Sequence, residues 1–212
     1  MTRLTKLDAA DFRYLGEHDK CVHLGEYTSG GGFQASTTNQ QIYNLKHRPS
    51  SPDSMLYWKR KAVAYWGNMI ASTNLNWEYC LENATFVPFP SSKPTDHAEY
   101  DPRVEQVLRV VARHKPGLDV RPVLRQSFER EPQHTGNRLT PDEIAASLTV
   151  DIELCRAQLK ETVIVVDDVI TRGSSFSAAK SILSKQPGVS HVLGLFLAKT
   201  IWEDDDDWAD AL

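Results

Sequence analysis

The stretch VIVVDDVITRGSS, residues 163–175, combines residue types that can bind a ligand. Four β-branched residues, 163–166, precede Asp167 and Asp168, and such a continuous run is typical of a parallel strand covered on both faces. Two adjacent carboxylates beside a buried element are costly unless something outside the core uses them. We therefore expect Asp167 and Asp168 to accept hydrogen bonds from a ligand.

The residues after the carboxylates favour an anion. Thr171, Arg172, Gly173, Ser174 and Ser175 form a small, hydroxyl-rich turn before a predicted helix, where free backbone N–H groups and the helix dipole attract phosphate. A sugar phosphate fits both features, because its hydroxyls can donate to the carboxylates while its phosphate binds the turn. The pattern is neither a Walker A loop nor a dinucleotide fingerprint, since GxxxxGK[ST] and GxGxxG are absent.

A repeated order of strands and helices must position these residues. Apolar runs predict strands at 20–27, 84–90, 118–125, 163–166 and 189–198. Helical spacing follows two of them, over 104–112 and again after Gly173. This alternation predicts an α/β fold with a mostly parallel sheet, in which ligands bind beyond the carboxyl ends of the strands.

The first third of the chain is predicted to be largely helical. A helix begins within 39–45 and ends before Pro49, and a second occupies 55–70. Thr140, Pro141 and Glu143 predict a later short helix that starts with a capping box. We expect an N-terminal hood at 1–75, an α/β core at 76–201 and an acidic, solvated tail at 202–212.

Composition narrows the class of protein. The 212 residues are 41% hydrophobic with a net charge of −4, and no run approaches the roughly 18 apolar residues of a membrane span. We expect a cytoplasmic protein without a membrane partner, since no export signal is visible. Three scattered cysteines, Cys21, Cys80 and Cys155, predict core residues and not a zinc ribbon. The negative charge argues against nucleic acid as a partner, and the basic clusters 46–48 and 59–61 are interpreted as solvated faces.

All thirteen positions of VIVVDDVITRGSS resemble the PRPP-binding signature of the type I phosphoribosyltransferases. From about residue 20 to residue 200 the chain also resembles the ComF subgroup, the competence-associated phosphoribosyltransferase-like proteins. The resemblance implies a type I phosphoribosyltransferase-like fold and a Mg²⁺-dependent transfer from PRPP to a base, with release of pyrophosphate. Asp167 and Asp168 would hold the ribose hydroxyls. Mg²⁺ would bind mainly through PRPP, so no residue is assigned as a dedicated metal ligand.

The resemblance also implies two further groups of site residues. FVPFPSSK, residues 86–93, resembles the strand and loop that hold pyrophosphate in the family, with contacts from Ser91, Ser92 and Lys93. The loop from Arg125 to Arg138 corresponds in position to the flap that closes over PRPP. The flap residues that would meet the leaving anion are Arg125, Arg130, His134 and Arg138.

Two departures from the ComF pattern keep two functions open. The four-cysteine ribbon is absent, and HAEYDPRVEQ, residues 97–106, replaces the expected Arg-Gly-Phe-Asn-Gln sequence. The complete thirteen-residue motif favours an enzyme. The missing acceptor sequence favours a non-catalytic module that binds PRPP or a nucleotide and acts through protein partners in DNA uptake, DNA processing or defence. Many relatives are dimers, so a homodimer is also implied; the sequence does not specify the acceptor base.

Overall fold

A six-stranded mixed sheet forms the centre of the protein. The structure is a computed structural model that describes residues 2–130 and 139–202. In spatial order the strands are β1 (Thr5–Lys6), β2 (Cys21–Ser29), β8 (His191–Trp202), β7 (Thr162–Ile170), β3 (Ala84–Pro88) and β4 (Asp119–Val120). All neighbours are parallel except β1, which runs antiparallel to β2. The predicted α/β class with a mostly parallel sheet is therefore confirmed, and the architecture is Rossmann-like.

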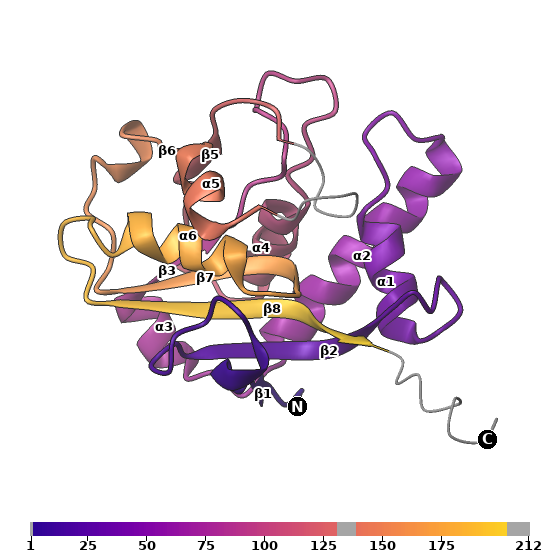
Figure 1. The fold of residues 1–212 in the computed structure, drawn as a ribbon, viewed down its shortest axis with the longest axis horizontal. Helices are drawn as coiled ribbons and strands as arrows, with labels where there is room; N and C mark the ends of the chain where they lie inside the picture. Colours follow the sequence, from indigo (N-terminus) through magenta and orange to yellow (C-terminus); the bar gives the residue numbers. More distant parts are fainter. Residues whose placement is uncertain (1, 131–138, 203–212) are drawn as a thin grey trace.

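Helices cover both faces of this sheet. One face packs against α1 (Thr37–Leu45), α2 (Asp53–Ala71), α3 (Trp77–Asn83) and α4 (Arg103–His114), and the other against α5 (Pro141–Ala146) and α6 (Ser174–Leu183). Figure 1 shows α5 and α6 on one side of β7 and β8. Along β7, Val163 and Val165 face the α5–α6 side, whereas Ile164 and Val166 face the other. Burial on both faces explains the uninterrupted β-branched run.

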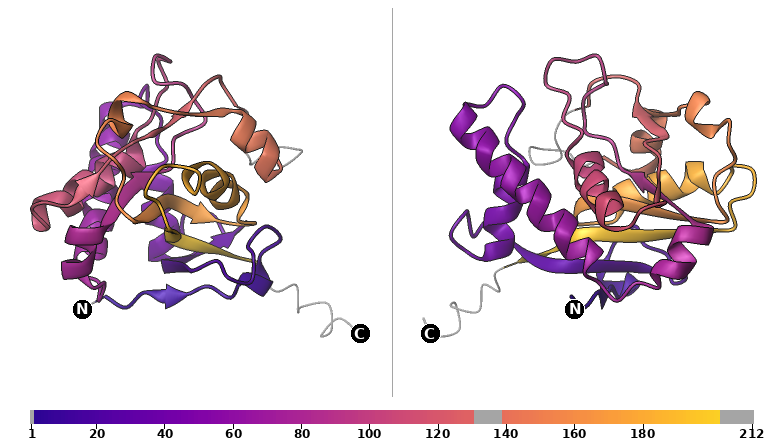
Figure 2. Two further views of the ribbon diagram at one scale, coloured as in Figure 1. Left: turned by 90° about the vertical axis from the view of Figure 1, so that its left-hand side faces the viewer. Right: turned by 180° about the vertical axis from the view of Figure 1, so that it is seen from behind.

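The long helices α2 and α4 cross the sheet in close contact, as the right-hand view of Figure 2 shows. A Cβ on Gly67 would lie 2.5 Å from the Cβ of Val110, so only glycine allows this approach. Trp66 and Ile70 of α2 are fully buried in the same layer. Among residues 2–130 and 139–202, no helix has the length and apolar content needed to cross a bilayer.

The segment 118–125 is not the single strand that the sequence predicted. Its first part is β4, which pairs with β3, and its second part is β5 (Leu124–Gln126), which pairs antiparallel with β6 (Leu148–Val150) in a separate sheet. Pro122 lies between them and has no N–H to continue the β3 ladder. The chain therefore leaves the central sheet at this residue.

Strand β7 is longer than predicted. It continues through both carboxylates to Ile170, and Asp167 pairs in register with Phe196 of β8. The two acids are thus parts of a fixed ladder, and they follow the buried run without leaving the strand. The predicted capping box is confirmed, because the Thr140 hydroxyl accepts from the Glu143 N–H and the Glu143 carboxylate accepts from the Thr140 N–H.

Residues of the predicted N-terminal hood share the sheet and the core with the rest of the protein. Strand β2 pairs with β8 from Cys21 to Ser29. Ile42 and Trp66 belong to the same hydrophobic cluster as Ile164 of β7. Short 3₁₀ turns occupy Ala9–Asp11 and Glu153–Cys155. Of the predicted acidic tail, only residue 202 falls within the described residues.

Candidate functional site

A pocket of about 510 Å³ opens where β2, β3, β7 and β8 end. The structure brings most of the predicted site residues to its wall: Ser91, Ser92, Lys93, Arg130, Asp167, Asp168, Thr171, Arg172, Gly173, Ser174 and Ser175. These residues come from the loop after β3, the segment after β5, and the end of β7 with the turn into α6. Sequence positions that lie far apart therefore meet at the carboxyl ends of parallel strands, where ligands bind in such sheets.

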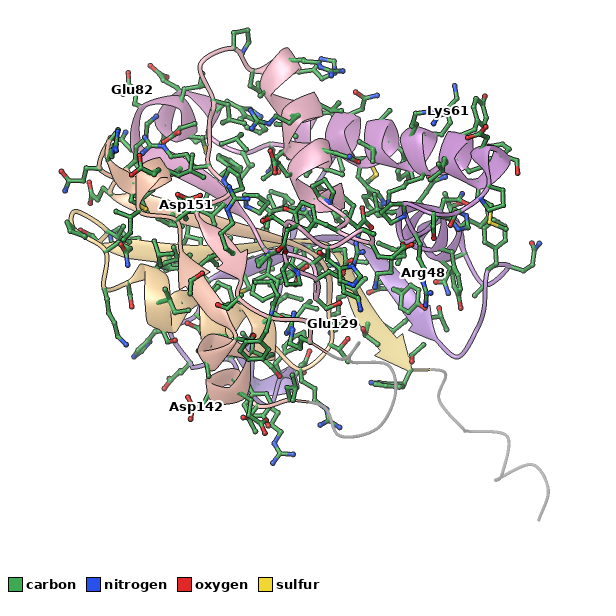
Figure 3. The ribbon with its side chains drawn as sticks, turned by 90° about the horizontal axis from the view of Figure 1, so that it is seen from above. Arg48, Lys61, Glu82, Glu129, Asp142 and Asp151 are labelled. Atoms are coloured by element: carbon green, nitrogen blue, oxygen red, sulfur yellow. The ribbon has the colours of Figure 1, made fainter. Side chains whose placement is uncertain are left out.

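Three of the predicted flap residues are not placed in this pocket. Arg125 does not line it, since its guanidinium donates to Asp151 Oδ2 at 3.1 and 3.2 Å. In Figure 3 Asp151 lies well away from Arg48, which is a pocket residue. His134 and Arg138 lie outside the described residues. Of the four, only Arg130 is brought to the pocket by the described structure.

The two carboxylates have opposite electrostatic environments. Burial would raise the pKa of Asp168, but Lys46 and Arg103 lower it well below its usual range. The Lys46 Nζ lies 3.5 Å from Asp168 Oδ1. Arg103 Nε donates to Asp168 Oδ2 at 2.8 Å, and Arg103 Nη2 lies 2.8 Å from the same oxygen. Burial raises the pKa of Asp167 to about 7, and the negative charge of Asp168 adds to this effect. Asp168 is thus a permanent anion, whereas Asp167 titrates near neutral pH.

Asp167 is the carboxylate left for a ligand. Its Oδ1 accepts a hydrogen bond from the Asp168 backbone N–H at 2.7 Å. It makes no ion pair with any described residue, in contrast to Asp168. No group of three or more His, Cys, Asp or Glu side chains in the described parts of the chain is arranged to hold a metal ion. Asp167 fits a metal that is bound mainly by a ligand's oxygens, because that metal needs few protein contacts.

A buried network behind Asp168 was missed by sequence reasoning. Arg103 also donates to Asp101 Oδ2 at 2.9 Å, and the same oxygen accepts from Lys59 Nζ at 2.8 Å. Lys59 is only 7% exposed, so the interpretation of 59–61 as a solvated face is wrong for this residue. A sequence signal existed, because Lys59 falls on the helical stripe of Ala62 and Trp66. The segment that departs from the ComF pattern supplies Asp101 and Arg103.

Arg130 has a buried guanidinium that makes no ion pair with a described residue. Its side chain is 8% exposed, lies over the ring of Phe89 at 5.8 Å, and leaves Nε and Nη1 without a hydrogen bond. Its backbone N–H donates to the Ser92 carbonyl at 2.8 Å, which joins this residue to the loop after β3. Burial lowers the pKa of Arg130, and the charge of Asp167 raises it. An unpaired buried cation is costly, so its position indicates an anionic ligand.

The sequence predicted that Lys93 contacts pyrophosphate, but in the structure its ammonium group is paired with an acid. It lines the pocket, but its Nζ pairs with Glu129, the neighbour of Arg130. His97 Nε2 lies 3.5 Å from the other Glu129 oxygen. An anion in the pocket would compete with the Glu129 carboxylate for Lys93.

The turn before α6 has the geometry of an anion site. Gly173 precedes the helix with φ +85°, a conformation that favours glycine, and α6 begins without a side-chain cap. The first N–H groups of a helix therefore remain available for an anion. Residues near the N-terminus support the turn from outside: the Tyr14 N–H donates to the Arg172 carbonyl at 3.0 Å, and Leu15 packs against Gly173. Thr171 and Thr200 share a 2.8 Å hydrogen bond between their hydroxyls.

The sequence matches no protein-family model and no curated protein. The functional argument therefore depends on the pocket. Its wall combines one anionic and one titrating carboxylate, an uncapped helix N-terminus and an unpaired buried arginine. Such a set of groups can hold a ligand that has both hydroxyls and phosphates.

Proposed function

We propose that the protein is a Mg²⁺-dependent phosphoribosyltransferase of the type I, ComF-like kind, which binds PRPP and transfers its ribose phosphate to a base. The observation that carries the proposal is the convergence of three groups in one pocket: the pair Asp167 and Asp168, the turn 171–175 and the buried Arg130. PRPP has a hydroxylated ring between two phosphate-bearing ends.

In this proposal each part of PRPP has its own binding residues. The 5′-phosphate binds the turn 171–175 and the N-terminus of α6, where backbone N–H groups are available. The ribose hydroxyls donate to Asp167 and Asp168. The diphosphate binds over the loop after β3, where Arg130, Lys93 and the hydroxyls of Ser91 and Ser92 supply donors.

The chemistry follows from positioning and charge. A nitrogen of the acceptor forms a bond to C1 of the ribose while the C1–O bond breaks, and the bonding electron pair leaves with pyrophosphate. Any proton on that nitrogen passes to water. The carboxylates of Asp167 and Asp168 stabilise the positive charge that develops on the ring, and Arg130 and Lys93 stabilise the departing anion. Mg²⁺ bound mainly through PRPP would be held on the protein side by Asp167 and would supply further charge neutralisation.

One observation favours the alternative, a module that binds PRPP or a nucleotide without turnover and acts through protein partners. Asp168 is already engaged by Arg103 and Lys46. Ribose hydroxyls must share or displace these cations. A pocket of this kind can bind the sugar phosphate and still be poorly set up for transfer.

Calorimetry with PRPP, with and without Mg²⁺, tests the proposal. We expect Mg²⁺-dependent binding to the wild type, at least tenfold weaker binding to Asp167→Asn, and unchanged binding to Asp142→Asn, an exposed acid in α5. Circular dichroism checks that each variant is folded. Absence of PRPP binding to the wild type contradicts the proposal. Binding without pyrophosphate release, across a panel of bases, supports the non-catalytic module.

A further inference from the structure

The proposed function assigns no part of PRPP to one arginine of the pocket. Lys46 and Arg103 are paired with Asp168, and Lys93 is paired with Glu129. The remaining pocket cations, which make no ion pair with a described residue, are Arg48, Arg130 and Arg172. Under the proposed function, Arg130 and Arg172 serve the two phosphate-bearing ends of PRPP. Arg48 is left without an anion.

The topology places Arg48 on the side of β7 from which an acceptor must approach. In the sheet, β3 and its pyrophosphate loop flank β7 on one side, and β8 followed by β2 flank it on the other. Tyr27 and Ser29, near the carboxyl end of β2, line the pocket together with Arg48. Figure 3 shows Arg48 and Glu129, the partner of Lys93, on either side of the C-terminal part of β8. A nucleophile that displaces pyrophosphate in line attacks C1 from the face opposite the leaving group, which is this side.

The backbone beside Arg48 is held by buried contacts. Lys59 Nζ donates to the Leu45 carbonyl at 2.6 Å and to the His47 carbonyl at 2.8 Å. These two bonds fix the chain on both sides of Lys46 and directly before Arg48. Pro49 further restricts the backbone of Arg48. The backbone that carries Arg48 is thus held in place beside the pocket that this residue lines.

The charge on this wall is positive. Lys46 is balanced by Asp168, so Arg48 adds an uncompensated charge. Burial, together with a side-chain hydrogen bond to Tyr43, raises the pKa of Tyr27 to about 12, so its phenol stays neutral. Tyr27 offers an aromatic surface and Ser29 a hydroxyl. The wall is suited to a planar ring with one anionic substituent.

We propose that Tyr27, Ser29, Lys46 and Arg48 form an acceptor subsite for a nitrogen heterocycle that carries a carboxylate, with Arg48 as the residue that selects it. A guanidinium binds a carboxylate through two parallel hydrogen bonds, which a neutral ring cannot offer. The carboxylate itself does not react; the ring nitrogen forms the bond to C1 as pyrophosphate leaves. This inference rests on the proposed function.

Pyrophosphate release from PRPP and Mg²⁺ tests the subsite with two matched pairs of acceptors: orotate against uracil, and nicotinate against nicotinamide. Each pair differs in a carboxylate on an otherwise similar ring. We expect release with the carboxylated member of at least one pair to be about tenfold faster, since a charged hydrogen bond contributes about that factor. Arg48→Gln removes the preference and Arg48→Lys retains part of it. Arg60→Gln, an exposed arginine of α2, leaves it unchanged.

The outcomes separate this inference from the proposed function. Equal or faster release with the neutral rings overturns the subsite, and so does release with none of the four compounds. PRPP binding, measured by calorimetry on the same preparations, decides whether the proposed function falls as well. In the Arg48→Gln variant we expect a PRPP affinity within about twofold of the wild type. A larger loss of PRPP affinity assigns Arg48 to PRPP and contradicts its role as a selector.

Discussion

The adjacent acids of β7 differ in protonation because their partners differ. Asp168 forms ion pairs with two cations, whereas Asp167 forms none with a described residue, and burial and the charge of Asp168 push it toward neutrality. The pair therefore carries fewer than two full charges near neutral pH. Its titration should be visible in the pH dependence of stability.

Asp167 should destabilise the fold as it ionises. Its pKa is raised from 3.8 to about 7, so the folded state binds this proton more tightly than the unfolded chain does. The resulting stability is fully present below about pH 4 and is lost as pH rises through about 7. We expect Asp167→Asn to raise the free energy of unfolding by about 2 kcal/mol at pH 8, and by much less at pH 5. Urea denaturation at both pH values measures the difference; an equal effect at the two would show that Asp167 is not the titrating group.

We expect Arg130 to strengthen ligand binding and to lower the stability of the ligand-free protein. Its guanidinium is buried, and two of its nitrogens have no hydrogen-bond partner in the part of the chain that the structure describes. Arg130→Met should therefore stabilise the ligand-free protein by about 1–3 kcal/mol. The same variant should bind PRPP at least tenfold more weakly. Arg125→Met is the matched control, because Arg125 is paired with Asp151 and lies outside the pocket. This control should lose stability and keep its PRPP affinity, as thermal denaturation and calorimetry would show.

At the scale of elements, the turn into α6 depends on one glycine. Gly173 has φ +85°, and an added Cβ would lie 2.9 Å from Leu15 Cδ2. Gly30 has φ +86°, and a Cβ added to it would have no atom within 4 Å. Gly30→Ala therefore measures the cost of the backbone conformation alone. We expect Gly30→Ala to lower the free energy of unfolding by about 1 kcal/mol, and Gly173→Ala to lower it by about 1–3 kcal/mol more. If chemical denaturation shows equal losses of unfolding free energy in the two variants, the Leu15 side chain moves aside without an energetic cost.

The short helix α5 depends on its capping box. Thr140 and Glu143 exchange hydrogen bonds between side chain and backbone, and α5 packs against α6. Thr140→Ala should reduce the free energy of unfolding by about 1 kcal/mol, while Thr140→Ser should retain most of it. Urea denaturation tests both. A loss in the serine variant as large as in the alanine variant would assign the effect to the threonine methyl group.

At the scale of the whole molecule, Lys59 joins three parts of the fold. It binds the carbonyls at the end of α1 and the carboxylate of Asp101, which in turn holds Arg103 against Asp168. The layer of α1 and α2 is thereby fixed relative to β7. The geometry of the pocket then depends on a residue that does not line it.

We expect Lys59→Met to lower the free energy of unfolding by about 3–5 kcal/mol. The variant removes one of the cations that pair with buried Asp101, and it leaves the Leu45 and His47 carbonyls without the donor that Lys59 provides. Lys61→Met, an exposed position on the same helix, should change stability by less than about 0.5 kcal/mol. Thermal and urea denaturation compare the two variants. A small effect of Lys59→Met would show that its buried bonds are replaced by water.

Local patterns in the sequence determined the elements that carry the site. The β-branched run 163–166, the turn 171–175 and the capping box at Thr140 each specify their own backbone through short-range sterics and hydrogen bonds. The strand 118–125 was predicted wrongly, because Pro122 divides it between two sheets. Which strand each half joins depends on partners far away in the sequence.

Only the tertiary structure decided which charges meet. Lys59 and Asp101 are 42 positions apart, and Arg103 and Asp168 are 65 apart, so no local pattern links them. Arg130 lies over Phe89, and Arg125 pairs with Asp151, because the chain leaves the central sheet before β5 and β5 pairs with β6 in a separate sheet. Charge pairing acts through space and changes steeply with distance and burial. The sequence therefore singled out Asp167, Asp168 and the turn 171–175, which line one pocket, whereas the fold determined which pocket cations make no ion pair with a described residue.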